Sequence, residues 1–186
     1  MSSDPRTDFL QVASWVGDLI SATTVDQLGL PTPDAGWTVR DLLAHIVHVE
    51  STVSTVVDPG NPVSAAEPTD TTWAEVYEAG LSHIATVFNE PGILEKTTTT
   101  FFGEMPAGDF ITRFTPEILV HGWDLAKATG QDLEGPSEVA ERTLKTALVS
   151  NPAEGRNPKA FAAPVEPPAG AGPTTQLAAW LGRTQS

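Results

Sequence analysis

The chain contains no cysteine among its 186 residues, and this absence excludes several kinds of functional site. Disulfide bonds, zinc sites built from thiolates and catalysis by a cysteine nucleophile are all ruled out. If a metal ion binds, its protein ligands must be histidine, aspartate or glutamate side chains. If a thiol takes part in the chemistry, a small molecule must bring it.

Long apolar runs and basic residues are also scarce. No apolar run approaches the roughly 18 residues needed to span a membrane. The first residues lack the basic start, apolar middle and cleavage site of a signal peptide, so we expect a cytoplasmic protein without a membrane partner. Only 10 basic residues oppose 24 acidic ones, for a formal net charge of −14. Because a field of this sign repels phosphate backbones, we expect no nucleic-acid partner.

Apolar side chains recur every three to four residues in several stretches, which is the spacing of helices with one buried face. This spacing predicts long helices at 8–22, 39–57, 71–89 and 106–129. Thr38 and Asp41 resemble a capping box at the start of the second helix, and Gly130 is expected to end the fourth.

The remaining segments are shorter or irregular. Four consecutive threonines and two phenylalanines within 94–102 favour a short extended segment or hairpin. A fifth helix is expected at 137–150, with Ser137 able to cap it, and a terminal helix at 174–182. The Pro-rich segment 151–173 between these two helices reads as an irregular surface segment.

These elements together predict an all-α fold. Four helices of this length, joined by turns and one extended excursion, fit a four-helix bundle with additional C-terminal helices. The length suits a single domain over residues 1–186, in which about 137–186 form a helical extension with a Pro-rich loop. Phosphate-binding glycine loops and the Gly-x-Ser-x-Gly motif are both missing from the sequence.

Polar residues interrupt the inward stripes of two of these helices. Glu117 and His121 are four positions apart on the fourth helix, so they differ by about 40° in direction and about 6 Å in height. They therefore project from one face, in a stripe that is otherwise aromatic and aliphatic. On the second helix, His45 lies in an aliphatic stripe.

His45, Glu117 and His121 together form a ligand set for one divalent metal ion, with coordination positions left open for water or substrate. A carboxylate in a core costs several kcal/mol unless it is compensated, and a cation would compensate it. Two other interpretations stay open on spacing alone. The histidines could be satisfied core residues, and the Glu–His pair could be a surface hydrogen bond or ion pair.

Two further residues near this set are candidates for supporting roles. His48 lies one turn after His45 and could line the same pocket, although a solvated histidine at the rim is the alternative. Asp124 lies three residues after His121 and could orient its ring, although it could equally be a plain surface acid.

Two segments closely resemble the hallmark motifs of a known family. They are Trp37-Thr-Val-Arg-Asp-Leu-Leu-Ala-His45 and Glu117-Ile-Leu-Val-His121-Gly-Trp-Asp-Leu-Ala126, and the final Leu181-Gly-Arg183 resembles the family's usual ending. The family is the actinobacterial metal-binding family that includes the N-terminal domain of mycothiol-dependent maleylpyruvate isomerase, within the DinB/YfiT-like superfamily. The resemblance extends over nearly the whole chain.

The resemblance implies an up-down-up-down bundle that holds a divalent metal ion through His45, Glu117 and His121. The metal is expected to be zinc, with nickel or another divalent ion as the alternative, and a low-molecular-weight thiol such as mycothiol is the expected co-reactant. Only 56 residues follow Gly130, too few to assume the second domain of the isomerase. Basic residues for substrate are also scarce, and Arg40 and Arg113 are the obvious candidates.

Three functions are therefore expected in turn. The first is a maleylpyruvate isomerase-like enzyme that uses a metal and a thiol for isomerisation or S-transfer on a small molecule, as a monomer or homodimer. The second is a module that binds a metal or small molecule, for instance in a stress response, without turnover. The third is a bundle that has kept the residues but binds no ion.

Overall fold

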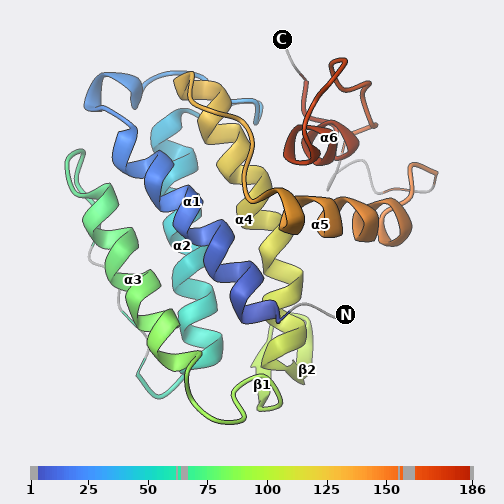
Figure 1. Ribbon diagram of the computed structural model, residues 1–186. Coiled ribbons are helices and arrows are strands. Elements are labelled where there is room, and N and C mark those ends of the chain that lie inside the picture. The colour runs from blue at the N-terminus through green and yellow to red at the C-terminus, as the bar shows by residue number, and fades with distance from the viewer. Residues whose placement is uncertain (1–3, 62, 64–66, 155, 157–161, 185–186) are drawn as a thin grey trace.

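A computed structural model describes residues 4–61, 63, 67–154, 156 and 162–184 (Figure 1). Four long helices lie side by side: α1 (Pro5–Ala22), α2 (Val39–Val57), α3 (Trp73–Val87) and α4 (Ala107–Thr129). The other elements are η1 (Val25–Gln27), β1 (Thr97–Thr100), β2 (Gly103–Pro106), α5 (Ser137–Ser150) and α6 (Pro173–Trp180). The predicted four-helix bundle with C-terminal helices is confirmed. Among the described helices, none is long and apolar enough to cross a membrane.

The direction of the third helix differs from the up-down-up-down order. Arg40 at the start of α2 pairs with Asp70 just before α3, and Glu50 in the middle of α2 lies against Gly80 in the middle of α3. Both pairs have the same sequence separation of 30 residues, so α2 and α3 run parallel and the order is up-down-down-up. The segment 58–72 is long enough for this return, because an extended chain of its length spans about 50 Å and α2 only about 28 Å.

Local capping residues fix the ends of the helices. The Thr38 backbone N–H donates to Oδ2 of Asp41 at 2.8 Å, and the Asp41 N–H donates to Thr38 Oγ1 at 3.3 Å, so the capping box at the start of α2 is confirmed. Gly130 ends α4 with a φ of 73°, a conformation that glycine adopts without strain. The cap expected of Ser137 is wrong, because Pro136 occupies the N-cap position and Ser137 is already helical.

The extended segment is an antiparallel hairpin of β1 and β2, which runs beyond the predicted range of 94–102. Its second strand, Gly-Glu-Met-Pro, has little strand propensity and is held by pairing with β1. Buried Thr98 donates its hydroxyl to the Val56 carbonyl at 2.7 Å. This bond anchors the hairpin to the end of α2. At the tip of the hairpin, Phe101 and Phe102 are exposed.

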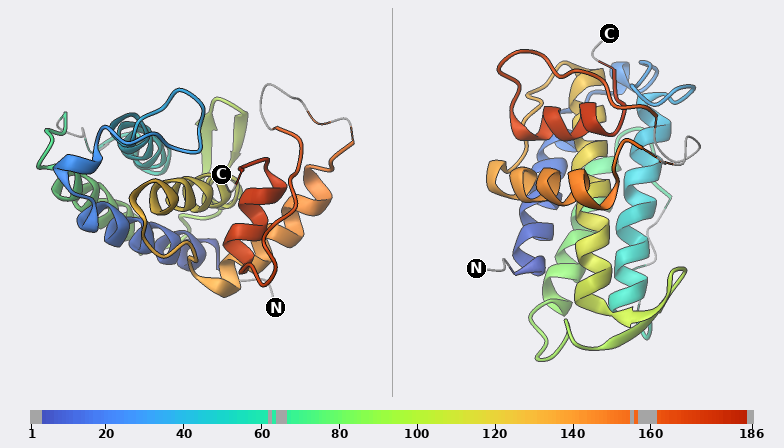
Figure 2. Two further views of the ribbon diagram at one scale, coloured as in Figure 1. Left: turned by 90° about the horizontal axis from the view of Figure 1, so that it is seen from above. Right: turned by 90° about the vertical axis from the view of Figure 1, so that its right-hand side faces the viewer.

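The C-terminal helices lie crosswise over one flank of the bundle (Figure 2). α6 packs on α4, and α5 packs on α6. Buried Trp123 of α4 donates its indole N–H to Thr175 of α6 at 3.0 Å. Next to it, Gly122 allows Trp15 of α1 to approach, since any side chain there would collide with the indole. The extension therefore docks on the turn of α4 that follows His121.

One acid lies inside the bundle. Glu50 is 2% exposed and contacts Gly80, and its Oε1 has no hydrogen-bond partner among the described residues. Burial raises the pKa of this carboxyl from 4.5 to about 8. The fold thus encloses a carboxylic acid on the face of α2 that packs against α3, and the sequence pattern gave no indication of it.

Candidate metal centre

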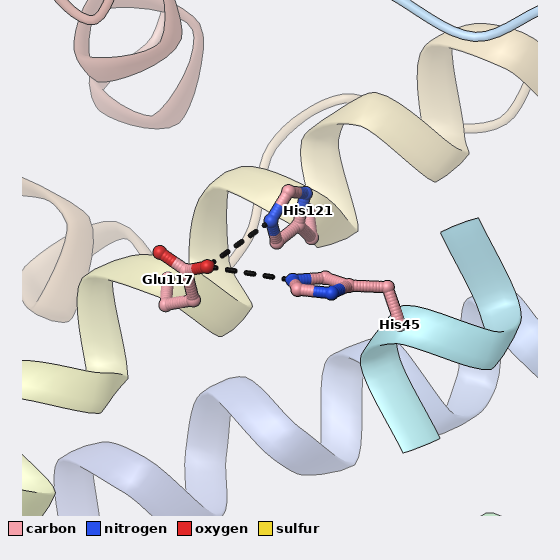
Figure 3. A group of neighbouring side chains, drawn as sticks. All are labelled: His45, Glu117 and His121. Carbon is pink, nitrogen blue, oxygen red and sulfur yellow. Dashed lines mark hydrogen bonds and ion pairs between the residues drawn. The ribbon is translucent and has the colours of Figure 1, made fainter. Parts of the chain in front are cut away.

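Three side chains from two helices meet beside the bundle core. His45 comes from α2, and Glu117 and His121 come from successive turns of α4, with their ligand atoms directed toward one another (Figure 3). Glu117 Oε1 lies 3.4 Å from His45 Nε2 and 3.4 Å from His121 Nε2. The two imidazole centroids are 4.7 Å apart. The structure thus brings together the three residues that the helical spacing selected.

The separations suit a shared cation. Distances of 3.4 Å exceed the usual 2.9 Å of an N–H···O hydrogen bond. Zinc binds imidazole nitrogen and carboxylate oxygen at about 2.0–2.1 Å, and the edge of such a tetrahedron is about 3.4 Å. Two imidazoles and one carboxylate are also a donor set of open zinc sites, in which a water or substrate completes the coordination. The residues present therefore fit a divalent ion.

The three groups differ in exposure, and one expectation about them is wrong. His121 is buried and His45 half-buried, but the Glu117 side chain is 46% exposed. The argument that a carboxylate confined to the core needs a cation therefore does not hold. Phe114 and His121, one turn before and one turn after Glu117 on α4, are buried. Glu117 itself lines two open pockets.

The second nitrogen of His121 contacts a buried acid, as the sequence had suggested. Nδ1 lies 3.1 Å from Oδ2 of Asp124, which is fully buried, and 3.5 Å from Asp34. Arg183, just beyond α6, pairs with both acids at 3.1 and 2.9 Å. With Nδ1 engaged by Asp124, Nε2 is the nitrogen that faces Glu117.

Sequence reasoning missed Asp34 and Arg183 as site residues. Asp34 lies in a turn segment rich in glycine and proline, and a lone acid in such a segment carries no periodic signal. Arg183 had one available signal, its place in the Leu181-Gly-Arg183 ending. The pair is separated by 149 residues, so only the fold reveals it.

The electrostatics of the centre favour an added positive charge. Burial lowers the pKa of His121, but hydrogen bonds to Asp124, Asp34 and Glu117 outweigh this and raise it to about 11. Hydrogen bonds from His121 and then His45 hold the pKa of Glu117 well below its usual range, although burial opposes them. Three carboxylates thus face one guanidinium, that of Arg183, which leaves two negative charges. The proton on His121 balances one of them, and a divalent cation in its place would balance both.

Two pockets meet at Glu117. The first, here called the aromatic pocket, has a volume of about 320 Å³ and lies between α2, the hairpin tip and α4; His45, His48 and Phe102 are among its lining residues. The second, here called the extension pocket, has about 210 Å³ and lies between α4, α5 and α6, with Arg183 in its wall. Arg113 and Glu117 line both. Two small reactants could therefore approach the centre from opposite sides.

Trp37 packs against both imidazoles of the centre. Its ring packs edge-on against His45, with centroids 5.0 Å apart, and stacks on His121 at 6.2 Å. Because Trp37 directly precedes the capped start of α2, the same short segment fixes the helix and restrains both imidazoles. Arg40, the other basic candidate, pairs with Asp70 and lines neither pocket.

Comparisons with known proteins agree with this architecture. Two crystal structures share the fold over 82% of this chain and 72% of theirs: mycothiol-dependent maleylpyruvate isomerase, with a TM-score of 0.60 and 16% identity, and a histidine-to-alanine variant of it, with 0.63 and 15%. At such identity the likeness establishes the fold alone.

Sequence comparisons identify the family to which the chain belongs. The uncharacterized proteins Rv0738 and MT0763, from two strains of Mycobacterium tuberculosis, are each 36% identical over 168 residues, which cover 89% of this chain and 90% of theirs. The family model for the mycothiol maleylpyruvate isomerase N-terminal domain matches residues 9–126, which include all three residues of the centre. The chain therefore belongs to the mycothiol maleylpyruvate isomerase N-terminal domain family.

Proposed function

We propose that this protein is an enzyme in which His45, Glu117 and His121 hold one divalent metal ion, with zinc as the first choice, and in which a low-molecular-weight thiol such as mycothiol reacts with a small molecule. The reaction class is thiol-dependent isomerisation or S-transfer, in the cytoplasm. The observation that carries the proposal is one carboxylate oxygen 3.4 Å from two imidazole nitrogens, at the junction of two pockets. Membership of a family named for a mycothiol-dependent enzyme supports the use of a thiol co-reactant. A small molecule must bring this thiol, because the chain has no cysteine of its own.

The side chains of the centre have separable roles in this proposal. Asp124 accepts the Nδ1 proton of His121 in a hydrogen bond, so that Nε2 is the nitrogen that would give up its proton and bind the metal. Arg183 neutralises one of the two acids behind that ring, buried Asp124 and half-buried Asp34. Trp37 restrains both imidazoles. A bound divalent ion would lower the pKa of a thiol or water bound to it, and it would polarise the carbonyl group of a substrate. The two pockets give room for thiol and substrate.

The proposal is tested on protein purified without a histidine tag. We expect about one metal ion per chain in the wild type, and less than about a tenth of that in His45→Ala and His121→Ala, because two remaining ligands bind weakly. His83→Ala is the matched control, since His83 lies on α3 beside Asp58 and lines neither pocket. Equally little metal in all four proteins would refute the site.

Turnover separates an enzyme from a binding module of the same fold. Thiol transfer to a panel of small electrophiles is measured with mycothiol, bacillithiol and glutathione. We expect metal-dependent transfer with mycothiol, lost in His121→Ala and kept in His83→Ala. Metal binding without turnover in any combination would contradict the enzymatic part of the proposal and favour a module that binds a metal or small molecule.

Asp124 provides a prediction about metal affinity. Asp124→Asn keeps the shape of the side chain but weakens the hydrogen bond that orients His121, and changes to such supporting partners cost about 10- to 100-fold in metal affinity. Competition with a chromophoric chelator measures the loss. Asp109→Asn, which removes an exposed charge from the same helix, should leave the affinity within about twofold of the wild type. Unchanged affinity in a folded Asp124→Asn variant would contradict the assigned role.

A further inference from the structure

Arg113 differs from the other arginines of the chain in what its guanidinium contacts. Among the described residues it has no carboxylate within ion-pair distance, and its recorded contact is the ring of Phe102, whose centroid is 5.7 Å away. The other five arginines pair with acids or donate to backbone carbonyls: Arg6, Arg40, Arg142, Arg156 and Arg183. In a chain of net charge −14, an arginine without an acidic partner is conspicuous.

The location of Arg113 suits it to bind an anionic ligand near the candidate metal centre. Arg113 lies one turn before Glu117 on α4 and lines both the aromatic and the extension pocket. No ion pair joins Arg113 to Glu117, whose Oε1 lies 3.4 Å from a nitrogen of each imidazole. The exposed, cationic side chain of Arg113 thus lies beside the candidate metal centre with its donors available.

Three phenylalanines contribute to the apolar lining of the aromatic pocket. Phe101 and Phe102 of the hairpin tip lie 4.2 Å apart between centroids, and Phe101 meets the ring of Phe114 of α4 edge-on at 5.9 Å. Phe101 is 69% exposed and Phe102 54%, which is costly for large apolar side chains unless something covers them. A volume of about 320 Å³ is at the lower end of small-molecule sites, so a covering ligand would be small.

We propose that the aromatic pocket binds a small organic carboxylate with a planar apolar body, its carboxylate on Arg113 and its body against Phe101, Phe102 and Phe114. A guanidinium pairs with a carboxylate through two parallel hydrogen bonds, and phenylalanine faces and edges accept a flat conjugated body. A ligand held in this way extends along the wall that includes His45 and Glu117. The inference rests on the proposed function for its chemistry, because that wall would present the ligand to a bound metal and thiol.

The test uses trans-cinnamate and its neutral analogue trans-cinnamamide as probes, titrated calorimetrically into the full chain with and without zinc. We expect cinnamate to bind saturably in both states and cinnamamide at least about tenfold more weakly, as for the loss of a charge-assisted contact. Arg113→Gln should weaken cinnamate binding by about tenfold or more, and Arg113→Lys by less. Arg40→Gln, which removes the same charge from an arginine outside both pockets, should not change it.

Three results would overturn the inference. They are no saturable cinnamate binding by the wild type, equal binding of acid and amide, and a loss in His45→Ala without a loss in Arg113→Gln, which would place the carboxylate on a metal instead. The two proposals fail separately. A protein that binds no metal but shows cinnamate binding dependent on Arg113 would refute the proposed function and support this pocket, whereas a metal-loaded protein indifferent to cinnamate would do the reverse.

Discussion

Replacing Glu50 with glutamine is expected to raise the free energy of unfolding by about 4 kcal/mol at pH 8 but by less than about 1 kcal/mol at pH 5. The cause is the burial of this carboxyl between α2 and α3, which raises its pKa from 4.5 to about 8. Between those two values the folded chain keeps a proton that the unfolded chain has released. Stability therefore falls as pH rises through this window, and glutamine, which has no proton to lose, escapes the penalty.

Urea unfolding of the wild type and Glu50→Gln at pH 5 and pH 8 measures the effect. Glu78→Gln is the control, since it removes an exposed carboxylate from α3. We expect that the difference between Glu78→Gln and the wild type is small and the same at both pH values. A benefit of Glu50→Gln that did not grow between pH 5 and pH 8 would show that Glu50 is not held protonated in the fold.

Zinc is expected to stabilise the wild type by about 2.7 kcal/mol when free zinc is 100 times the dissociation constant. The ligands come from α2 and α4, which meet only in the folded chain, so the ion binds the folded state in preference to the unfolded one. If His45→Ala weakens binding by about 100-fold, the same zinc concentration stabilises that variant by less than about 0.5 kcal/mol. His83→Ala should behave as the wild type.

Thermal or urea unfolding with and without zinc provides this comparison. A chelator added to the zinc-loaded wild type should return its stability to the metal-free value. Equal stabilisation of the wild type and His45→Ala would mean that zinc acts elsewhere on this acidic surface, and it would contradict the assignment of His45.

Local patterns explain how much of the fold could be predicted. Helices, the capping box of Thr38 and Asp41, and the left-handed Gly130 all depend on residues within one or two turns, so spacing alone sufficed. The parallel course of α2 and α3 could not be derived in this way. It depends on the path of segment 58–72, and a connection of that length permits either direction.

The same distinction applies to the candidate site. Glu117 and His121 share a face by helix geometry, so one helix was enough to pair them. Whether that face points into the core or toward a pocket depends on the neighbouring helices and the hairpin. Helix spacing does not contain this information, so it predicts a buried Glu117 where the structure has a half-exposed one. Asp34 and Arg183 come from a turn and the last residues of the chain, and no period links them to His121.

The central claim is that two imidazoles and a carboxylate from α2 and α4 hold one divalent ion. An anomalous-difference map from crystals of tag-free protein grown with zinc, recorded at the zinc absorption edge, tests it most directly. We predict one strong peak about 2.0–2.2 Å from Nε2 of His45, Nε2 of His121 and a carboxylate oxygen of Glu117. A map with no peak there, or with these three side chains turned apart, would contradict the account.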